Sequence, residues 1–126
     1  YHYLARLYQQ MGLLDKAAAA YEKALALNFE PSLAFSLARL YEHSRRYTKA
    51  EEVYRRVLEK NPVDEKARYL LADLYRRQGR NERALAELEE LRTYTGDIRA
   101  SDLAMARIMI DAKQYDRALA ILRRSL

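Results

Sequence analysis

The sequence predicts an all-helical solenoid of four helical hairpins, and three observations support this fold class. The string LARLY occurs at residues 4–8 and 37–41, and the variant LADLY occurs at 71–75. Alanines recur at spacings of 33, 34 and 34 residues: Ala17, Ala50, Ala84 and Ala118. Within each copy the apolar residues fall three and four positions apart, as on one face of a helix. Four copies of one structural unit are therefore expected.

The first copy shows how each hairpin is expected to form. Leu4, Leu7 and Met11 lie on one helical face, and Ala17 and Tyr21 lie on one face of a second helix. Gly12 lies between these two helices, where the chain must reverse, because glycine readily adopts the left-handed conformation. The same register places the four repeats at about 1–29, 30–63, 64–97 and 98–126, all within a single domain, 1–126.

The later copies have their own boundary signals. Pro31 is expected in the first turn of a helix, where its missing amide is tolerated, and Pro62 is expected to end the second hairpin. Gly79 takes the place of Gly12 in the third copy, whereas Arg45 and Lys113 take it in the second and fourth. The prediction of turns at Arg45 and Lys113 therefore rests on the repeat register alone.

These residues resemble the tetratricopeptide repeat, a unit of about 34 residues with a large residue, a Leu, a Tyr, an Ala, an aromatic residue and a closing Pro. The second copy matches most fully, and its matching residues are Leu37, Ala38, Tyr41, Ala50, Tyr54 and Pro62. The resemblance implies stacked hairpins that share a core and curve into a right-handed superhelix with a concave side. Its function would be to bind another protein.

In this family the first helix of each hairpin lines the concave groove, so the resemblance implies a set of groove residues. The innermost row is apolar or aromatic: His2, Phe35, Tyr69 and Leu103. One turn further on lies a mostly basic row of Arg6, Arg39, Asp73 and Arg107, with Arg76 and Arg77 near the lip. Such rows would bind a partner protein or peptide that carries acidic and apolar residues. The alternative interpretation makes the aromatics framework and the arginines solvated surface.

A subgroup of the family binds the terminal carboxylate of chaperones with a lysine and asparagine clamp. The five clamp places are occupied here by His2, Arg6, Ser36, Lys66 and Leu70, of which Lys66 alone agrees. A co-chaperone role is therefore not expected.

Composition excludes several other classes of function. The chain has no cysteine, which rules out disulfides and thiolate zinc sites. His2 and His43 are the only histidines, and no nucleophile motif, carboxylate pair or glycine-rich phosphate loop accompanies them. We therefore expect no enzyme activity, no cofactor and no metal. No apolar run is long enough to span a membrane, so a soluble segment of the cytoplasm or periplasm is expected.

Nucleic acid is a rival partner, because the net charge is +5 and arginine doublets recur. Glu51, Glu52 and Asp73 each precede an arginine by four residues, which is the spacing of helical ion pairs. Residues 64–97 carry seven basic and eight acidic side chains, so a continuous basic stripe is not expected there. The charge pattern argues against nucleic-acid binding.

The ends of the chain suggest a further possibility. Tyr1 falls inside a helical pattern, and Ala118, Ile121, Leu122 and Leu126 form an apolar stripe. We expect a piece of a longer protein whose neighbouring repeats, or a second copy, cover this stripe. The alternative function is therefore structural, with self-association through apolar ends.

Overall fold

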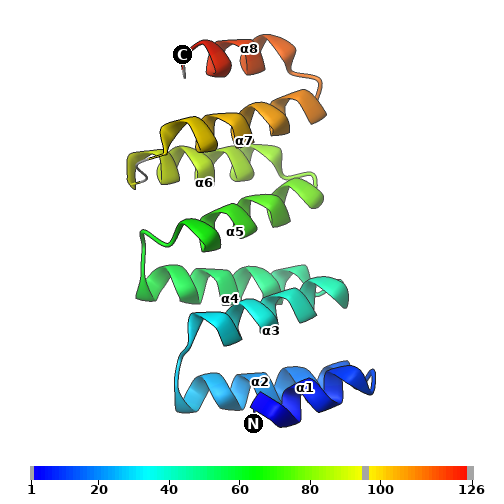
Figure 1. Cartoon of the computed structure of the whole chain (residues 1–126). Helices are drawn as coiled ribbons and strands as arrows, with labels where there is room; N and C mark the ends of the chain where they lie inside the picture. Colours follow the sequence, from blue (N-terminus) through cyan, green and yellow to red (C-terminus); the bar gives the residue numbers. More distant parts are fainter. Residues whose placement is uncertain (1, 95–96, 125–126) are drawn as a thin grey trace. The chain divides into compact units, whose positions relative to one another are not determined.

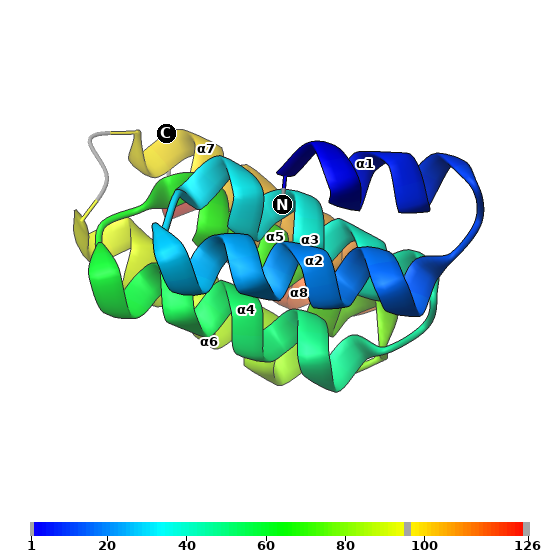
Figure 2. The ribbon, with the colours of Figure 1, turned by 90° about the horizontal axis from the view of Figure 1, so that it is seen from below.

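A computed structural model describes residues 2–94 and 97–124, and it contains eight α-helices and no strand among them (Figure 1). In chain order they are α1 (His2–Gln10), α2 (Leu14–Leu27), α3 (Pro31–His43), α4 (Tyr47–Lys60), α5 (Glu65–Arg77), α6 (Asn81–Tyr94), α7 (Ile98–Asp111) and α8 (Tyr115–Arg124). Four pairs pack as antiparallel hairpins, namely α1 with α2, α3 with α4, α5 with α6 and α7 with α8, as Figure 2 shows for α1 and α2. The predicted all-helical repeat fold is confirmed.

The helices form two compact units, each of two hairpins. Unit 1 is Tyr1–Lys60 and contains α1 to α4, and unit 2 is Asn61–Leu126 and contains α5 to α8. Within unit 1, α2 packs on α3, and within unit 2, α6 packs on α7. Among the described residues, no helix has the length and apolar character needed to cross a membrane.

The residues that recur in sequence make up the core. The small residues of the first helices, Ala5, Ala38, Ala72 and Ala106, are at most 2% exposed, and the alanines of the second helices, Ala17, Ala50, Ala84 and Ala118, are at most 3% exposed. Large side chains pack beside them, including Leu37 and Tyr54 in unit 1 and Leu71 and Tyr75 in unit 2. The small residues let the paired helices approach closely, which explains their regular recurrence.

Three helices begin at residues that are typical of helix N-termini, a proline and two aspartates. Pro31 begins α3, as expected for a residue without an amide proton. Asp64 and Asp97 cap α5 and α7, because one carboxylate oxygen of each accepts a hydrogen bond from the amide of Ala67 at 2.9 Å and of Ala100 at 3.0 Å.

All four hairpin turns contain a residue in the left-handed conformation. Gly12 and Gly79 have φ of 75° and 77°, and Arg45 and Lys113 adopt the same conformation at 61° and 62°. In every turn the following amide donates to a carbonyl five residues earlier, at 2.7 to 2.9 Å: Leu13 to Tyr8, Arg46 to Tyr41, Arg80 to Tyr75 and Gln114 to Met109. The position of Tyr8, Tyr41 and Tyr75, which Met109 occupies in the fourth repeat, therefore supplies the carbonyl that ends the first helix of each hairpin.

Replacing Arg45 or Lys113 with glycine should raise the free energy of unfolding by about 1 kcal/mol each, because a side chain in the left-handed region costs about 1–2 kcal/mol. Urea unfolding followed by circular dichroism measures this change. Thr48→Gly in α4 is the control and should lower stability by a few tenths of a kcal/mol, the difference between the helix propensities of threonine and glycine. Lower stability of both turn variants would contradict the assigned conformations.

Unit 2 buries two charged side chains at the same place of successive repeats, Arg68 and Asp102, which are 5% and 0% exposed. One terminal nitrogen of Arg68 lies 3.0 Å from Glu87 Oε2 and 3.1 Å from Glu90 Oε2. The other donates to the carbonyl of Pro62 at 3.2 Å. The guanidinium is thus held by three groups.

Asp102 connects three helices of unit 2. Its Oδ1 accepts hydrogen bonds from Arg92 Nε and from Arg124 Nη2, both at 3.0 Å. Arg124 also donates to Glu89 at 2.5 Å, and its pKa is raised, first by this bond and then by the bond to Asp102. In α8 Ala118 is buried and Ile121 and Leu122 are half-buried, so these charged contacts add to a small apolar contact in holding α8.

Candidate functional site

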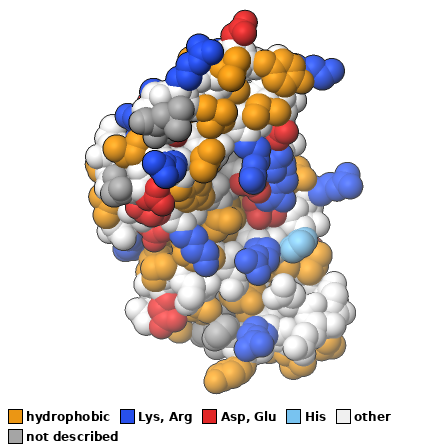
Figure 3. Space-filling model, turned by 45° about the horizontal axis from the view of Figure 1, so that its top comes forward, with side chains coloured by type: hydrophobic (Ala, Val, Ile, Leu, Met, Phe, Trp, Pro, Cys, Tyr) orange, Lys and Arg blue, Asp and Glu red, His pale blue; other side chains and the backbone are white. Residues whose placement is uncertain are grey.

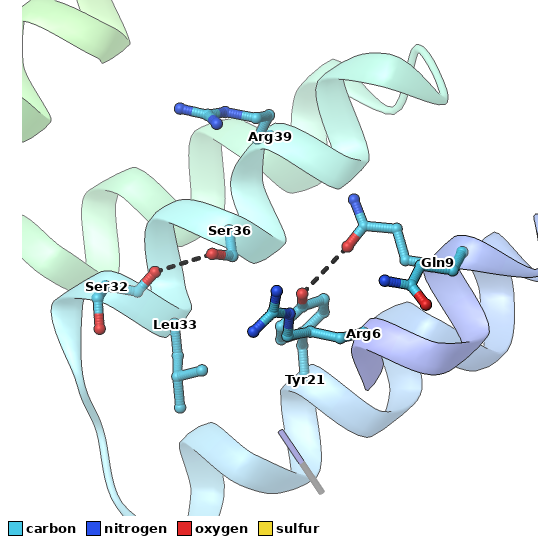
Figure 4. A pocket seen from close by; sticks show the side chains of 8 residues that line it. Arg6, Gln9, Tyr21, Ser32, Leu33, Ser36 and Arg39 are labelled. Atoms are coloured by element: carbon cyan, nitrogen blue, oxygen red, sulfur yellow. Dashed lines mark hydrogen bonds between the residues drawn. The ribbon is translucent and has the colours of Figure 1, made fainter. Parts of the chain in front are cut away.

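Unit 1 contains a pocket of about 620 Å³ between α1, α2 and α3 (Figure 4). It is lined by Arg6, Gln9 and Gln10 of α1, Tyr21 of α2, and Ser32, Leu33, Ser36 and Arg39 of α3. Arg6 and Arg39 occupy the same place in successive repeats, directly after the fully buried Ala5 and Ala38. The repeat geometry therefore brings both arginines to one pocket.

Hydrogen bonds position the polar side chains of this pocket. The Tyr21 hydroxyl donates to Gln9 Oε1 at 3.1 Å, and the Ser36 hydroxyl donates to the Ser32 carbonyl at 3.1 Å (Figure 4). Burial raises the pKa of Tyr21, and the charge of Arg6 opposes this shift in part. The phenol therefore stays neutral at physiological pH and adds no negative charge.

The lining of this pocket is positively charged. It contains two arginines and no acidic residue. Within the described part of the chain, neither Arg6 nor Arg39 takes part in an ion pair, and arginine stays protonated in proteins. The pocket therefore offers two arginine side chains to an anionic group.

Unit 2 has a second pocket, of about 200 Å³, on the first helices of its hairpins. It is lined by Tyr69, Ala72, Asp73 and Arg76 of α5, Leu88 of α6, and Ala104, Arg107 and Ile108 of α7. Asp73 and Arg107 occupy, in the third and fourth repeats, the position that Arg6 and Arg39 occupy in the first and second. All four members of this repeated place therefore line a pocket.

The second pocket is closer to neutral than the first. Arg76 Nη2 lies 2.6 Å from Asp73 Oδ1, Arg77 Nε lies 3.2 Å from Asp73 Oδ2, and Arg76 is also 3.7 Å from Asp111. Burial raises the pKa of Tyr69, with smaller contributions from nearby acidic residues, so this phenol is also neutral. The two pockets thus differ in charge although they share a repeat place.

The other expected groove residues lie apart from these linings. Phe35 is half-buried, and its ring centroid lies 6.4 Å from that of Tyr54 in a tilted arrangement. Leu103 is 53% exposed and precedes the pocket residue Ala104. The side chain of His2 lies outside the described residues.

Several pocket residues were missed by sequence reasoning. Gln9 and Gln10 lie three and four residues after Arg6, which places them on the same helical face, and that spacing is the signal that could have found them. Tyr21, which the sequence placed on one helical face with Ala17, is 2% exposed and also reaches the pocket. Ser32 precedes Ser36 by one helical turn.

Arginine doublets of the sequence are largely bound to carboxylates. Arg77 pairs with Asp73 at the predicted four-residue spacing. The predicted partner of Arg56 is wrong, because Arg56 pairs at 3.1 Å with Glu22 of α2 instead of Glu52 on its own helix. Basic and acidic side chains occur together on the face shown in Figure 3. This arrangement does not favour a nucleic-acid surface.

In the described ranges 2–94 and 97–124 there is no group of three or more His, Cys, Asp or Glu side chains that could hold a metal ion.

Comparisons with known proteins agree with the repeat pattern. The profile of the tetratricopeptide repeat matches residues 4–65, and that of anaphase-promoting complex, cyclosome, subunit 3, which is of the same repeat type, matches residues 43–125. No curated protein matches the chain in sequence.

Similar solved structures include crystal structures of MamA. One has a TM-score of 0.74 at 17% identity and covers 97% of this chain and 72% of MamA, and another has 0.74 at 17%, covering 99% and 69%. The structure of MamA MSR-1 C2 has a TM-score of 0.69 at 20% identity and covers 97% and 71%. At these identities the likeness shows the fold.

Proposed function

Because the chain belongs to the tetratricopeptide repeat family, whose repeats form protein–protein interaction scaffolds, we propose that it binds an extended or helical segment of a partner protein through the first helices of its hairpins. The observation that carries the proposal is that Arg6, Arg39, Asp73 and Arg107, one repeated place, all line pockets on those helices. A repeat position whose side chains line a pocket in each unit is more typical of a binding surface than of a buried core.

The chemistry of the two linings indicates the kind of segment. Arg6 and Arg39 in unit 1 would bind acidic side chains through paired hydrogen bonds. In unit 2, Tyr69, Leu88 and Ile108 offer apolar area beside the paired Asp73 and Arg76. A partner that carries both acidic and apolar residues would satisfy these surfaces. Scaffolds of this family are typically non-enzymatic, which agrees with this role.

Reversing two pocket charges, Arg39→Glu with Arg107→Glu, should reduce capture of the partner at least tenfold, because acidic side chains would meet like charge. Capture from native lysate at low salt, with and without nuclease, measures the effect for the full chain. The matched control is Arg83→Glu with Arg123→Glu, which makes the same charge change at exposed positions on α6 and α8.

We expect the control variant to retain the partner, and thermal melts should show that both variants fold. Capture that is unaffected by the pocket variant would overturn the proposal. Capture that nuclease abolishes would point to nucleic acid instead.

Self-association is the second candidate, and an exposed apolar surface on α1 favours it. Leu4 and Leu7 are 40% and 51% exposed, whereas Leu37 and Leu40 at the same places of α3 are 0% and 2% exposed. Leu119 of α8 is also 48% exposed. If the protein captured from lysate is mainly this same chain, and neither double variant changes its amount, assembly through these surfaces is favoured.

A further inference from the structure

We propose that the pocket between α1, α2 and α3 binds a doubly charged anionic group of the partner segment, either one phosphoryl group or two adjacent carboxylates. The inference rests on the proposed function and names the chemistry that one of its two pockets would recognise. The lining of this pocket carries the argument.

The first step is the unbalanced charge of the pocket. Arg6 and Arg39 contribute two positive charges, and no acidic side chain lines the cavity. Three carboxylates on or next to α2 and α3 are engaged elsewhere: Asp15 pairs with Arg46, Glu22 with Arg56, and Glu30 accepts a hydrogen bond from Asn28. A ligand with two negative charges would balance the two arginines, whereas a single carboxylate would balance one.

The second step is the supply of hydrogen-bond donors. Each guanidinium presents a planar fork of N–H groups that matches phosphoryl or carboxylate oxygens. Gln9 Oε1 accepts from Tyr21, which turns the Gln9 amide nitrogen, a double donor, away from the phenol and leaves it available (Figure 4). The Ser32 hydroxyl adds a donor from α3. These groups come from α1 and α3, and all of them belong to residues that line the same pocket.

The third step is the comparison of the two pockets. In unit 2, Asp73 lies at the repeat place of Arg39 and already binds Arg76 at 2.6 Å and Arg77 at 3.2 Å. An anionic ligand there would have to displace an internal carboxylate. In unit 1 no such competitor lines the pocket, and its volume of about 620 Å³ lies in the usual range of ligand sites, about 300–1,000 Å³.

Three immobilised peptide pools with degenerate flanks test the inference. Their fixed central residues are phosphoserine, Glu-Glu or serine, and the full 126-residue chain is the analyte. We expect at least tenfold more capture by the phosphoserine or Glu-Glu pool than by the serine pool. Arg6→Gln with Arg39→Gln should remove this preference, and the control, Arg83→Gln with Arg123→Gln, should keep it.

Changing pH distinguishes the two sources of charge. A phosphoryl group loses its second charge near pH 6, so capture of the phosphoserine pool should fall severalfold between pH 7.5 and 5.5. Glutamate keeps its charge down to about pH 4.3, so capture of the Glu-Glu pool should persist over this range. Either pattern supports a doubly charged ligand and identifies which kind it is.

Equal capture of all three pools by the folded chain would overturn this inference, even if a lysate partner is lost on Arg39→Glu with Arg107→Glu. A preference for the charged pools that survives Arg6→Gln with Arg39→Gln would also overturn it, because the anion would then bind elsewhere. Lysate capture that Arg39→Glu with Arg107→Glu leaves unchanged, together with a preserved peptide preference, would overturn the proposed partner surface and leave this pocket as an anion site.

Discussion

Replacing Arg68 with methionine is expected to lower the free energy of unfolding by about 3–5 kcal/mol, because Glu87 would stay buried without its counter-charge. Arg68 is 5% exposed and Glu87 is 6% exposed, and their charged groups lie 3.0 Å apart. The variant also loses the hydrogen bond to the Pro62 carbonyl and the contact of the guanidinium with the Tyr94 ring, 5.6 Å from its centroid. Urea unfolding followed by circular dichroism measures the change.

Two further variants test whether the cost comes from burying Glu87 without Arg68 beside it. Replacing both partners, Arg68→Met with Glu87→Leu, should bring stability back to within about 1 kcal/mol of the wild type or better, because no buried charge then remains unpaired. Arg77→Met should cost under about 1 kcal/mol, since Arg77 and Asp73 are both partly exposed. If Arg68→Met costs no more than Arg77→Met, the burial of this ion pair is not as described.

Changing Asp102 to asparagine is expected to release α8 before the rest of unit 2 unfolds. The side chain keeps its shape but loses the charge that binds Arg92 and Arg124 at 3.0 Å. Hydrogen bonds to charged groups contribute about 1.5–3 kcal/mol, so amide protection in α8 should fall by roughly tenfold to a hundredfold. Hydrogen exchange measured by mass spectrometry, with α6 peptides as the internal reference, reports this loss.

Glu89→Gln is the matched control for this prediction. Glu89 is half exposed, so water screens its bond to Arg124, even though that bond is the largest cause of the raised Arg124 pKa. Its removal should change α8 protection much less than Asp102→Asn. Equal effects of the two variants, or unchanged protection with Asp102→Asn, would mean that apolar packing holds α8 instead.

The repeat architecture was predictable from sequence because it depends on residues that recur. The alanine register and the LARLY strings placed four hairpins, and the structure shows four. The turns at Arg45 and Lys113 carried no glycine signal, yet both adopt the conformation of Gly12 and Gly79. Packing of the repeat imposes that conformation on residues that do not prefer it.

The electrostatics of the candidate site was less predictable, because several ion pairs join residues about one repeat apart. Arg46 binds Asp15, Arg56 binds Glu22 and Arg117 binds Glu82, at separations of 31, 34 and 35 residues. A search for partners four residues away cannot find such pairs. Sequence reasoning therefore identified Arg6 and Arg39 as binding candidates but could not show that other arginines are already paired, nor that Phe35 lies against Tyr54.

The buried charges of unit 2 have a consequence for how similar repeats avoid misassembly. Proteins built from near-identical segments risk pairing the wrong segments during folding. Arg68 and Asp102 occupy the same place in adjacent repeats with opposite sign, one beside Glu87 and the other beside Arg92 and Arg124. If α5 packed against α8, Arg68 would meet Arg124, and if α7 took the place of α5 beside α6, Asp102 would meet Glu87. Either wrong pairing would bury like charges together, at a cost of several kcal/mol. The two residues thereby favour the packing of α5 against α6 and of α7 against α6 and α8.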